Sequence, residues 1–269
     1  MIPQYSGATR IILILGDPIA QVKAPAGLTQ EFDKRQIDAV VMPLQVRPAD
    51  ITRVLAAVNA MANVDGIIAT VPHKFALAEH CSDLTDRAAF LGVANVARRN
   101  AGGGWSGDML DGEAFVDAIV SAGCIIGGES GLLVGAGGAG SAIGLSLLDR
   151  GLGRLAIFDI DTKRRTTLMN KLAAAHASKV IVGTDDPRGF SLVVNATPLG
   201  MSPGDPLPLD TSGLAPAMFV GDVITKPEIT PLLRQASDIG CRTQTGVGMF
   251  ESSVGLMTDF FTPSIGGAR

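Results

Sequence analysis

One short stretch limits the possible fold of this chain more than any other: residues 135–140 have the sequence Gly-Ala-Gly-Gly-Ala-Gly. An apolar run, residues 131–134, precedes this stretch, and a helical pattern, residues 139–148, follows it. G-x-G-x-x-G between a strand and a helix is typical of a dinucleotide-binding turn, in which the helix N-terminus holds the pyrophosphate. The alternative is a glycine-rich turn that packs closely and binds nothing. The context favours binding by Gly135, Ala136, Gly137, Gly138, Ala139 and Gly140.

An acidic residue, Asp159, lies 19 residues after Gly140, at the end of the next predicted strand. An acid at this distance accepts hydrogen bonds from the adenosine ribose hydroxyls of NAD and repels the extra phosphate of NADP. Asp159 could instead cap the helix that follows, a position for which Asp161 competes. The spacing predicts that NAD is preferred over NADP.

Short β-branched runs alternate with helical patterns along the whole chain. Strands are predicted at residues 11–15, 40–46, 66–71, 95–99, 131–134, 155–158, 180–182, 192–195 and 219–223. Helices are predicted at residues 26–35, 50–59, 74–90, 112–122, 139–148, 162–175, 229–239 and 250–261. Strands separated by helices indicate parallel sheets built from βαβ units. The strand at residues 95–99, turned by the glycines of residues 101–104, is expected to be the last of the first domain.

The predicted fold class is therefore α/β, with two domains. Residues 1–110 would form an N-terminal α/β substrate domain, and residues 111–242 a doubly wound, Rossmann-type NAD-binding domain. The last predicted helix has no strand of its own to cover. We therefore expect residues 243–269 to return to the first domain and complete it.

Composition and charge indicate which partners to expect. The chain has 22 Lys and Arg against 26 Asp and Glu, which argues against a nucleic-acid or anionic membrane surface. The three cysteines form no C-x-x-C pair and the histidines no H-E-x-x-H motif, so neither a disulfide framework nor a metal site is expected. Only five apolar residues follow Arg10, too few for a signal peptide. We expect a cytoplasmic protein with a small-molecule substrate and no membrane, nucleic-acid or metal partner.

Two further segments carry charged residues at positions suited to chemistry. Residues 70–74 (T-V-P-H-K) end a predicted strand and begin a helix, which places Lys74 at the carboxyl edge of a sheet, where ligands bind. Residues 107–112 (G-D-M-L-D-G) place Asp111 at the junction of the two predicted domains. Either residue alone would most simply be a solvated surface group. Together with the glycine turn, both become candidates for catalysis.

Several motifs, in the same order, resemble those of the shikimate/quinate dehydrogenase family over nearly the whole chain. The segment 70–74 resembles the family's T-x-P-x-K motif, and Asp111 with Gly112 resembles the end of G-x-N-T-D-G. The other matching segments are 16–19 with Pro25, 92–95, 195–201, 222–224, 230–233 and 246–249. Short motifs in the right order are far more specific together than any one of them alone.

The resemblance implies a dehydrogenase that moves a hydride between a ring hydroxyl of a cyclic hydroxy acid, such as shikimate or quinate, and a nicotinamide. It makes Lys74 and Asp111 the catalytic pair, one accepting the hydroxyl proton while the other holds the reacting groups. Burial favours a neutral lysine amine and a nearby carboxylate favours its ammonium form, so the sequence leaves the proton acceptor open. The implied substrate-binding positions are Val22, Ala24, Thr70, Asn95, Thr225 and Ser253. The implied cofactor positions beyond the glycine turn are Asp159, Ile160, Arg164, Asn195, Thr197, Pro198, Val223, Gly246 and Met249.

The chain departs from the family pattern mainly at the substrate. Two serines that bind the substrate carboxylate in the family are here Val22 and Ala24. Further departures stand at Ile68, Met109, Leu110, Thr225 and Ser253. Because each lost buried hydrogen bond costs ~1–3 kcal/mol, shikimate should bind poorly unless Lys23 or another cation takes over the carboxylate. Alternatively, the loop is shifted by one residue and Lys23 is merely exposed.

The chain also departs from the family at the cofactor. Where NADP-using members have N-R-T-x-x-R, residues 159–164 have D-I-D-T-K-R. Ile160 replaces the arginine that faces the 2′-phosphate, whereas Arg164 is kept and could stack on adenine. This agrees with NAD as the preferred cofactor.

Two alternatives to a shikimate-type enzyme stay open: a dehydrogenase of a different cyclic alcohol, and an NAD-binding sensor without turnover. Retention of both Lys74 and Asp111 favours an enzyme. The sequence is compatible with a monomer or a homodimer.

Overall fold

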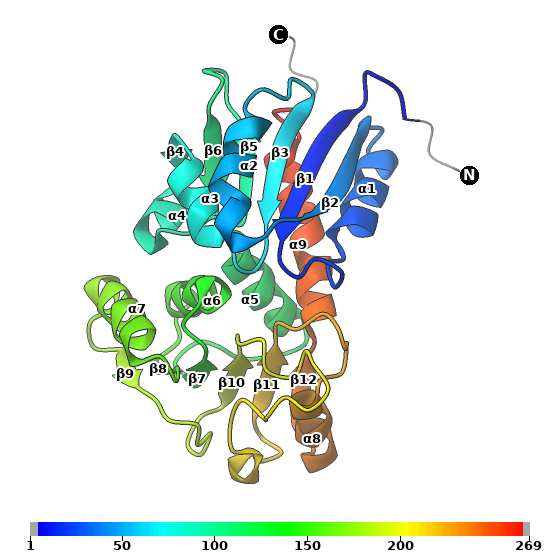
Figure 1. The fold of residues 1–269 in the computed structure, drawn as a ribbon. Helices are drawn as coiled ribbons and strands as arrows, with labels where there is room; N and C mark the ends of the chain where they lie inside the picture. Colours follow the sequence, from blue (N-terminus) through cyan, green and yellow to red (C-terminus); the bar gives the residue numbers. More distant parts are fainter. Residues whose placement is uncertain (1–4, 266–269) are drawn as a thin grey trace. The chain divides into compact units, whose positions relative to one another are not determined.

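The computed structural model describes residues 5–265, which fold into two α/β units (Figure 1). The first unit contains the chain up to Leu110 together with residues from Ser253 onward, and the second unit is Asp111–Ser252. Residues 243–252 therefore belong to the second unit, whereas the sequence analysis assigned all of residues 243–269 to the first. The reason is a short strand, β12 (Arg242–Gln244), that pairs with the sheet of the second unit. The predicted α/β class is confirmed.

The first unit is built on one mixed sheet of six strands in the order β2-β1-β3-β5-β6-β4. Strands β1 (Arg10–Gly16), β2 (Ala39–Gln45) and β3 (Val64–Ala69) are parallel. Strand β5 (Val96–Arg99) runs antiparallel to β3, and β6 (Trp105–Asp108) antiparallel to β5, while β4 (Asp83–Leu84) adds the far edge. The helices are α1 (Ala24–Lys34), α2 (Ile51–Val58), α3 (Lys74–His80) and α4 (Asp86–Leu91).

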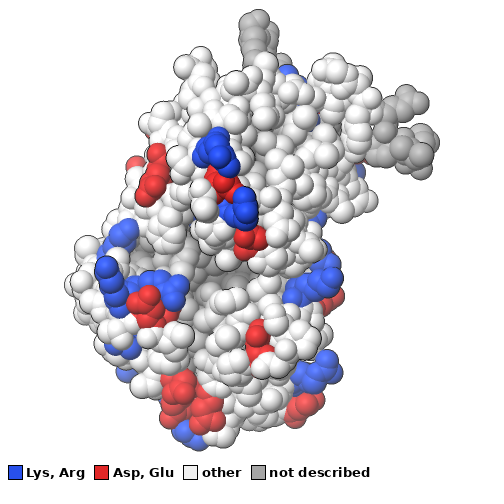
Figure 2. Space-filling model, in the orientation of Figure 1, with Lys and Arg blue, Asp and Glu red and all other residues white. Residues whose placement is uncertain are grey.

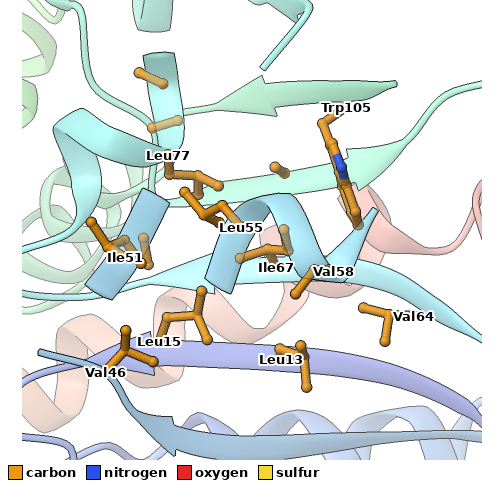
Figure 3. Packing of buried hydrophobic residues seen from close by; sticks show 14 residues of the cluster. Leu13, Leu15, Val46, Ile51, Leu55, Val58, Val64, Ile67, Leu77 and Trp105 are labelled. Carbon is orange, nitrogen blue, oxygen red and sulfur yellow. The ribbon is translucent and has the colours of Figure 1, made fainter. Parts of the chain in front are cut away.

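Alternating residues of the strands bury their side chains on the two faces of this sheet. On one face, Leu13, Leu15 and Ile67 pack against Leu55 of α2 and Leu77 of α3 (Figure 3). On the opposite face, Gly66 leaves room for the C-terminal helix α9 (Gly246–Phe261), because a Cβ at this glycine would lie 2.6 Å from the Phe261 ring. Both faces are covered, as expected for a sheet whose central strands are almost entirely apolar.

Two predictions for the first unit are wrong. The helix predicted at residues 74–90 is interrupted by β4, because Asp83–Leu84 pair with Ser106–Gly107 of β6. Only a glycine at residue 107 permits this, since a Cβ there would lie 2.7 Å from the Cys81 sulfur. Residues 95–99 are not the last strand, because the glycine-rich turn leads into β6 and the two strands form an antiparallel hairpin.

The second unit is a fully parallel sheet of six strands in the order β12-β11-β10-β7-β8-β9. The strands, besides β12, are β7 (Ser130–Val134), β8 (Arg154–Phe158), β9 (Val180–Val182), β10 (Leu192–Asn195) and β11 (Phe219–Asp222). The helices are α5 (Asp111–Ser121), α6 (Gly138–Asp149), α7 (Thr162–Ala175) and α8 (Pro231–Ile239), followed by the first part of α9. The strand order reverses at β7, which creates a switch point between the carboxyl ends of β7 and β10. This is the strand order of a Rossmann dinucleotide-binding domain.

Local signals explain where the helices of the second unit begin and end. Helix α8 begins after Thr230, whose hydroxyl accepts a hydrogen bond from the Leu233 N–H, and Pro231 occupies its first position. It ends at Gly240, whose φ of +101° is the left-handed conformation that glycine adopts without strain.

The described part of the chain contains no helix that is long and apolar enough to cross a membrane. On the face shown in Figure 2, basic and acidic side chains lie next to one another.

Candidate active site

The glycine turn between β7 and α6 contains two glycines that the fold itself requires. Gly135 has a φ of +103°, and a Cβ there would lie 2.9 Å from the backbone of Ala196. A Cβ at Gly140 would overlap the carbonyl oxygen of Gly135. Both glycines permit helix α6 to start directly against the strands. Their presence is therefore explained by packing and does not by itself indicate a ligand.

Gly137 is different, because no contact with the described residues requires a glycine there. Its φ of −79° suits any residue, and no heavy atom lies within 4 Å of a Cβ built on it. It occupies the N-cap position of α6 without a side chain that caps the helix. The positive end of the helix dipole therefore faces an open space at the switch point. This space, with the first-turn N–H groups beside it, fits a dinucleotide pyrophosphate.

The acidic residues after β8 have separate tasks. Asp161 caps α7, because its carboxylate accepts hydrogen bonds from the N–H groups of Lys163 and Arg164. Asp159 is buried, and its two oxygens accept hydrogen bonds of 2.8 Å from the N–H groups of Ala136 and Asp161. The open question of which acid caps the helix is thus decided in favour of Asp161. Asp159 is fixed beside the glycine turn, and each of its oxygens retains a second lone pair for a further donor.

The residues next to Asp159 differ in charge and exposure. Ile160 is 86 % exposed, and its side chain is apolar. Arg164 lies between two carboxylates, with its Nε 3.2 Å from Asp161 and its Nη2 3.7 Å from Asp159. Its positive charge is therefore partly neutralised within the same turn.

The carboxyl ends of β10 and β11 form a second polar centre in this unit. The Asn195 side chain accepts hydrogen bonds from the N–H and the hydroxyl of Thr197, and donates 3.2 Å to the Asp222 carboxylate. Asp222 also accepts hydrogen bonds from the Thr230 hydroxyl at 2.8 Å and from the Ile224 N–H at 3.0 Å. These bonds shape the turn that contains Pro198 and the segment that contains Val223 and Thr225.

Sequence reasoning assigned no role to Asp222 or Thr230, although both stand in segments that match the family motifs. The pairing of Asn195 with Asp222 follows from the register of β10 and β11, which the sequence does not display. Gly246, at the start of α9, is a glycine because a Cβ there would overlap the backbone of Val223 and Ile224. Met249 lies one turn further along α9.

In the first unit, several predicted residues lie at one edge of the sheet. Lys74 is the first residue of α3 and is only 9 % exposed. Thr70 directly follows β3 and accepts, through its carbonyl oxygen, a hydrogen bond from the His73 N–H. His73 is buried, and its Nε2 lies 2.7 Å from the carbonyl oxygen of Val46. The start of α3, and with it Lys74, is thereby fixed to the chain after β2.

Residues 94 and 95 connect the backbone of Lys74 with that of Leu110, at the end of the first unit. The Ala94 N–H donates to the Lys74 carbonyl oxygen, and the Asn95 side chain accepts 2.8 Å from the Leu110 N–H. Asn95 precedes β5, which runs antiparallel to β3, so it lies at the same sheet edge as Thr70. The backbone on either side of the buried lysine is thus part of one hydrogen-bonded network that extends to Leu110.

The remaining predicted substrate positions differ in burial and in the unit to which they belong. Ala24 is buried as the first residue of α1, Val22 is half-buried before it, and Lys23 is exposed. Their loop follows β1 and therefore lies at the edge of the sheet that also holds Thr70. Ser253 is buried on α9, where the helix enters the first unit. Thr225 belongs to the second unit and not to the unit of the other substrate positions.

Asp111 directly follows Leu110 and begins helix α5 in the second unit. Its partner in the motif, Gly112, lies so close to α6 that a Cβ there would overlap the carbonyl oxygen of Ala142. The helix that carries Asp111 is thus packed directly on the helix that follows the glycine turn. The catalytic carboxylate predicted from sequence and the pyrophosphate-sized space belong to one unit.

The segment before Asp111 is held by Asp108, a residue that the sequence analysis did not single out. Its carboxylate accepts two hydrogen bonds of 2.7 Å from Arg87 and one of 2.6 Å from the Thr85 hydroxyl. Burial raises the pKa of Asp108, but the hydrogen bonds from Arg87 and Thr85 outweigh burial and hold this pKa below its usual value. The carboxylate therefore stays ionised and paired. Within residues 5–265, no group of three or more His, Cys, Asp or Glu residues is arranged to hold a metal ion.

The strand order of a dinucleotide-binding domain, together with a second α/β unit, places the chain among two-domain α/β proteins. Residues 14–97 match the model of the shikimate dehydrogenase substrate binding domain. The shikimate dehydrogenase (NADP(+)) of Rhodospirillum rubrum is 34 % identical over 251 residues, which cover 91 % of this chain and 88 % of that protein. The chain belongs to the shikimate dehydrogenase family, whose members are NAD(P)-dependent oxidoreductases, and the predicted family is confirmed.

Solved structures agree with this assignment. Shikimate 5-dehydrogenase from Listeria monocytogenes, in complex with shikimate and NAD, superposes with a TM-score of 0.85 at 25 % identity and covers 98 % of this chain and 95 % of that chain. The ligand-free 5-ketofructose reductase of a Gluconobacter strain has the same fold, with a TM-score of 0.81, 22 % identity and coverage of 96 % and 94 %.

Proposed function

We propose that this protein is an NAD-dependent oxidoreductase of shikimate dehydrogenase type. It would interconvert a ring hydroxyl and a ketone on a cyclic hydroxy acid of the shikimate or quinate kind. The observation that carries the proposal is the buried Lys74 at the start of α3, whose carbonyl oxygen accepts a hydrogen bond from the Ala94 N–H and whose neighbour His73 bonds to Val46. A lysine seldom becomes buried without a task, because burial removes its ammonium from water.

The proposed chemistry uses Lys74 and Asp111 as a pair. The bound nicotinamide accepts or returns the hydride. In the oxidation direction, one member of the pair takes the hydroxyl proton of the substrate while the other orients the reacting groups. Thr70, Asn95, Thr225 and Ser253 would bind the substrate through hydrogen bonds. Val22 and Ala24 would border the carboxylate.

The test of this proposal is the absorbance change at 340 nm with NAD and a panel of cyclic alcohols. Lys74→Ala should reduce kcat on the best substrate by about 10²–10⁴-fold, the range for a lost general base. The affinity for NAD should stay within about twofold, because the cofactor residues lie in the second unit. Lys34→Ala, which removes an exposed lysine from α1, is the matched control and should leave kcat unchanged. Activity retained in Lys74→Ala would refute the assigned chemistry.

NAD is the cofactor that we propose, although the Rhodospirillum rubrum relative is named as NADP(+)-dependent. The buried Asp159 repels a 2′-phosphate, Ile160 offers it no charge, and Arg164 is already held between Asp159 and Asp161. We expect kcat/KM for NAD to exceed that for NADP by about a hundredfold or more, since each tenfold corresponds to ~1.4 kcal/mol. Asp159→Asn combined with Ile160→Arg should raise use of NADP. Equal KM values for both cofactors in the unmodified protein would contradict the proposal.

A second candidate substrate is an uncharged cyclic alcohol or sugar ketone. The apolar side chains of Val22 and Ala24 favour it, because neither can donate a hydrogen bond to a carboxylate. The related fold of a 5-ketofructose reductase is compatible with such a substrate. An extended panel distinguishes the candidates: shikimate and quinate are assayed for oxidation with NAD and NADP, and 5-ketofructose, a ketone, is assayed for reduction with NADH and NADPH. We further propose that the protein is cytoplasmic. We also propose that it is a monomer or a homodimer, which light scattering of the purified protein would test.

A further inference from the structure

Asp222 is a buried acid for which the proposed chemistry has no task. Its side chain is 0 % exposed at the carboxyl end of β11. Its Oδ2 accepts hydrogen bonds from the Asn195 amide and the Thr230 hydroxyl, and its Oδ1 accepts one from the Ile224 N–H. The Val223 N–H is a further donor. All of these donors are neutral, so they stabilise the carboxylate through dipoles and leave its negative charge in place.

The carboxylate is ionised under assay conditions. Burial raises the pKa of Asp222 to about 6, against the lowering effect of hydrogen bonds from Ile224, Asn195 and Thr230. At pH 8 the group is therefore an anion enclosed by protein. Because the interior screens charge far less than water does, its field extends to neighbouring groups.

The position of Asp222 in the sheet indicates which part of a bound dinucleotide lies nearest to its charge. A dinucleotide lies across the carboxyl ends of a doubly wound sheet, with one mononucleotide on each side of the switch point. Asp159 follows β8, on one side of the central strand β7, and is placed for the adenosine half. Asn195 and Asp222 end β10 and β11, on the other side. This leaves the β10–β11 side for the nicotinamide half.

We infer that the Asp222 carboxylate sets the relative affinity of this site for the two redox forms of the cofactor, favouring oxidised NAD over NADH. The inference rests on the proposed cofactor. The oxidised nicotinamide ring carries a positive charge and the reduced ring is neutral, so a buried anion on this side attracts only the oxidised form. In the bound state this makes NADH the better hydride donor and favours reduction of the ketone to the alcohol.

The neutral hydrogen-bond partners do not require a charged acceptor, and burial of a charge costs free energy. Removal of the charge should therefore change the discrimination between redox forms and not only the shape of the site. A purely structural role would change the affinities for both forms together.

The experiment measures dissociation constants of NAD, NADH and ADP-ribose by isothermal titration calorimetry on the full chain at pH 8. Asp222→Asn should weaken NAD about tenfold more than NADH, with ADP-ribose, which lacks the nicotinamide, unchanged within twofold. Thr230→Val is the matched control, because it removes a hydroxyl from the same cluster and keeps the charge. It should change the NAD and NADH constants by equal factors.

The outcomes separate this inference from the proposed function. An unmodified protein that binds none of the three ligands would refute the dinucleotide function and the inference together. Equal weakening of NAD and NADH in Asp222→Asn would overturn the inference alone. Asp222→Ser is the second neutral variant if the Asn variant does not fold. Failure of both to fold would also overturn the inference, because the Asp222 side chain would then be needed for the hydrogen bonds that hold the fold.

Discussion

The glycine turn provides a sharp test, because two of its glycines differ in what surrounds them. At Gly137 a methyl group would meet no atom of the described residues within 4 Å apart from its own neighbours in the chain, whereas at Gly140 it would overlap the carbonyl oxygen of Gly135. Gly137→Ala should therefore leave the fold intact and fill the space assigned to the pyrophosphate. Gly140→Ala should disturb the fold itself.

The expected magnitudes follow from these surroundings. In Gly137→Ala, a poorer N-cap costs about 0.5–1 kcal/mol, and the stiffer unfolded chain returns a similar amount, so the Tm should move by less than about 4 °C. Affinity for NAD should fall about a hundredfold, because one or two hydrogen bonds to the charged pyrophosphate are lost at ~1.5–3 kcal/mol each. In Gly140→Ala the backbone overlap should cost about 3 kcal/mol, which lowers the Tm by roughly 6–12 °C.

Calorimetric unfolding and NAD titration of the two variants check this reasoning. Gly137→Ala should weaken NAD binding and leave the Tm nearly unchanged. If this variant binds NAD as well as the unmodified protein does, the open space beside Gly137 does not hold the pyrophosphate. A Gly140→Ala protein with unchanged Tm would show that the turn relaxes around the added methyl.

Other perturbations test the substrate loop and the buried acid. Val22→Ser combined with Ala24→Ser should improve kcat/KM for shikimate tenfold or more. Each of the two hydroxyl donors to the substrate carboxylate contributes ~1.5–3 kcal/mol. Unchanged kinetics would mean that this loop does not contact the carboxylate. Asp222 has a pKa raised from 3.8 to about 6, so its contribution to stability is full below pH 4 and is lost as the pH rises through 6. The unfolding free energy of the unmodified protein relative to Asp222→Asn should fall by about 2.4 kcal/mol between pH 4 and pH 7 in denaturant titrations. A difference that does not vary with pH would refute the assigned pKa.

The parts of the fold that depend on local pattern could be predicted from the sequence. The glycine turn, the apolar strands and most helices carry their own signals, and the helix at residues 162–175 was predicted with its observed bounds. The strands β4, β6 and β12 could not be predicted, because they contain no apolar run and depend on partners elsewhere in the chain. Asp83–Leu84, for example, continues a helical spacing and becomes a strand only because Gly107 of β6 gives it room.

The residues of the candidate site also fall into two groups: those that the sequence motifs identify and those that only the structure shows. Lys74, Asp111, Asp159 and the glycine turn stand in motifs, so their positions could be found without a structure. The task of Asp222 could not, because its partners Asn195 and Thr230 are brought to it by strand register and by a helix cap. Nor could the sequence distinguish Gly137 from Gly140, since only the surrounding atoms show which glycine the fold needs.

Helix α9 also determines the order in which the units can be completed during synthesis. The ring of Phe261 covers Gly66, the Phe260 carbonyl accepts a hydrogen bond from Arg98, and Asp259 pairs with Arg35. A ribosome that has made the strands of the first unit has therefore not yet made the helix that covers one face of its sheet. The second unit, contiguous from Asp111 to Ser252, emerges whole before residues 253–261, the part of α9 that belongs to the first unit. The unit whose synthesis begins first is thus closed last, and until then the apolar residues around Gly66 are exposed to the chaperones and proteases of the cell.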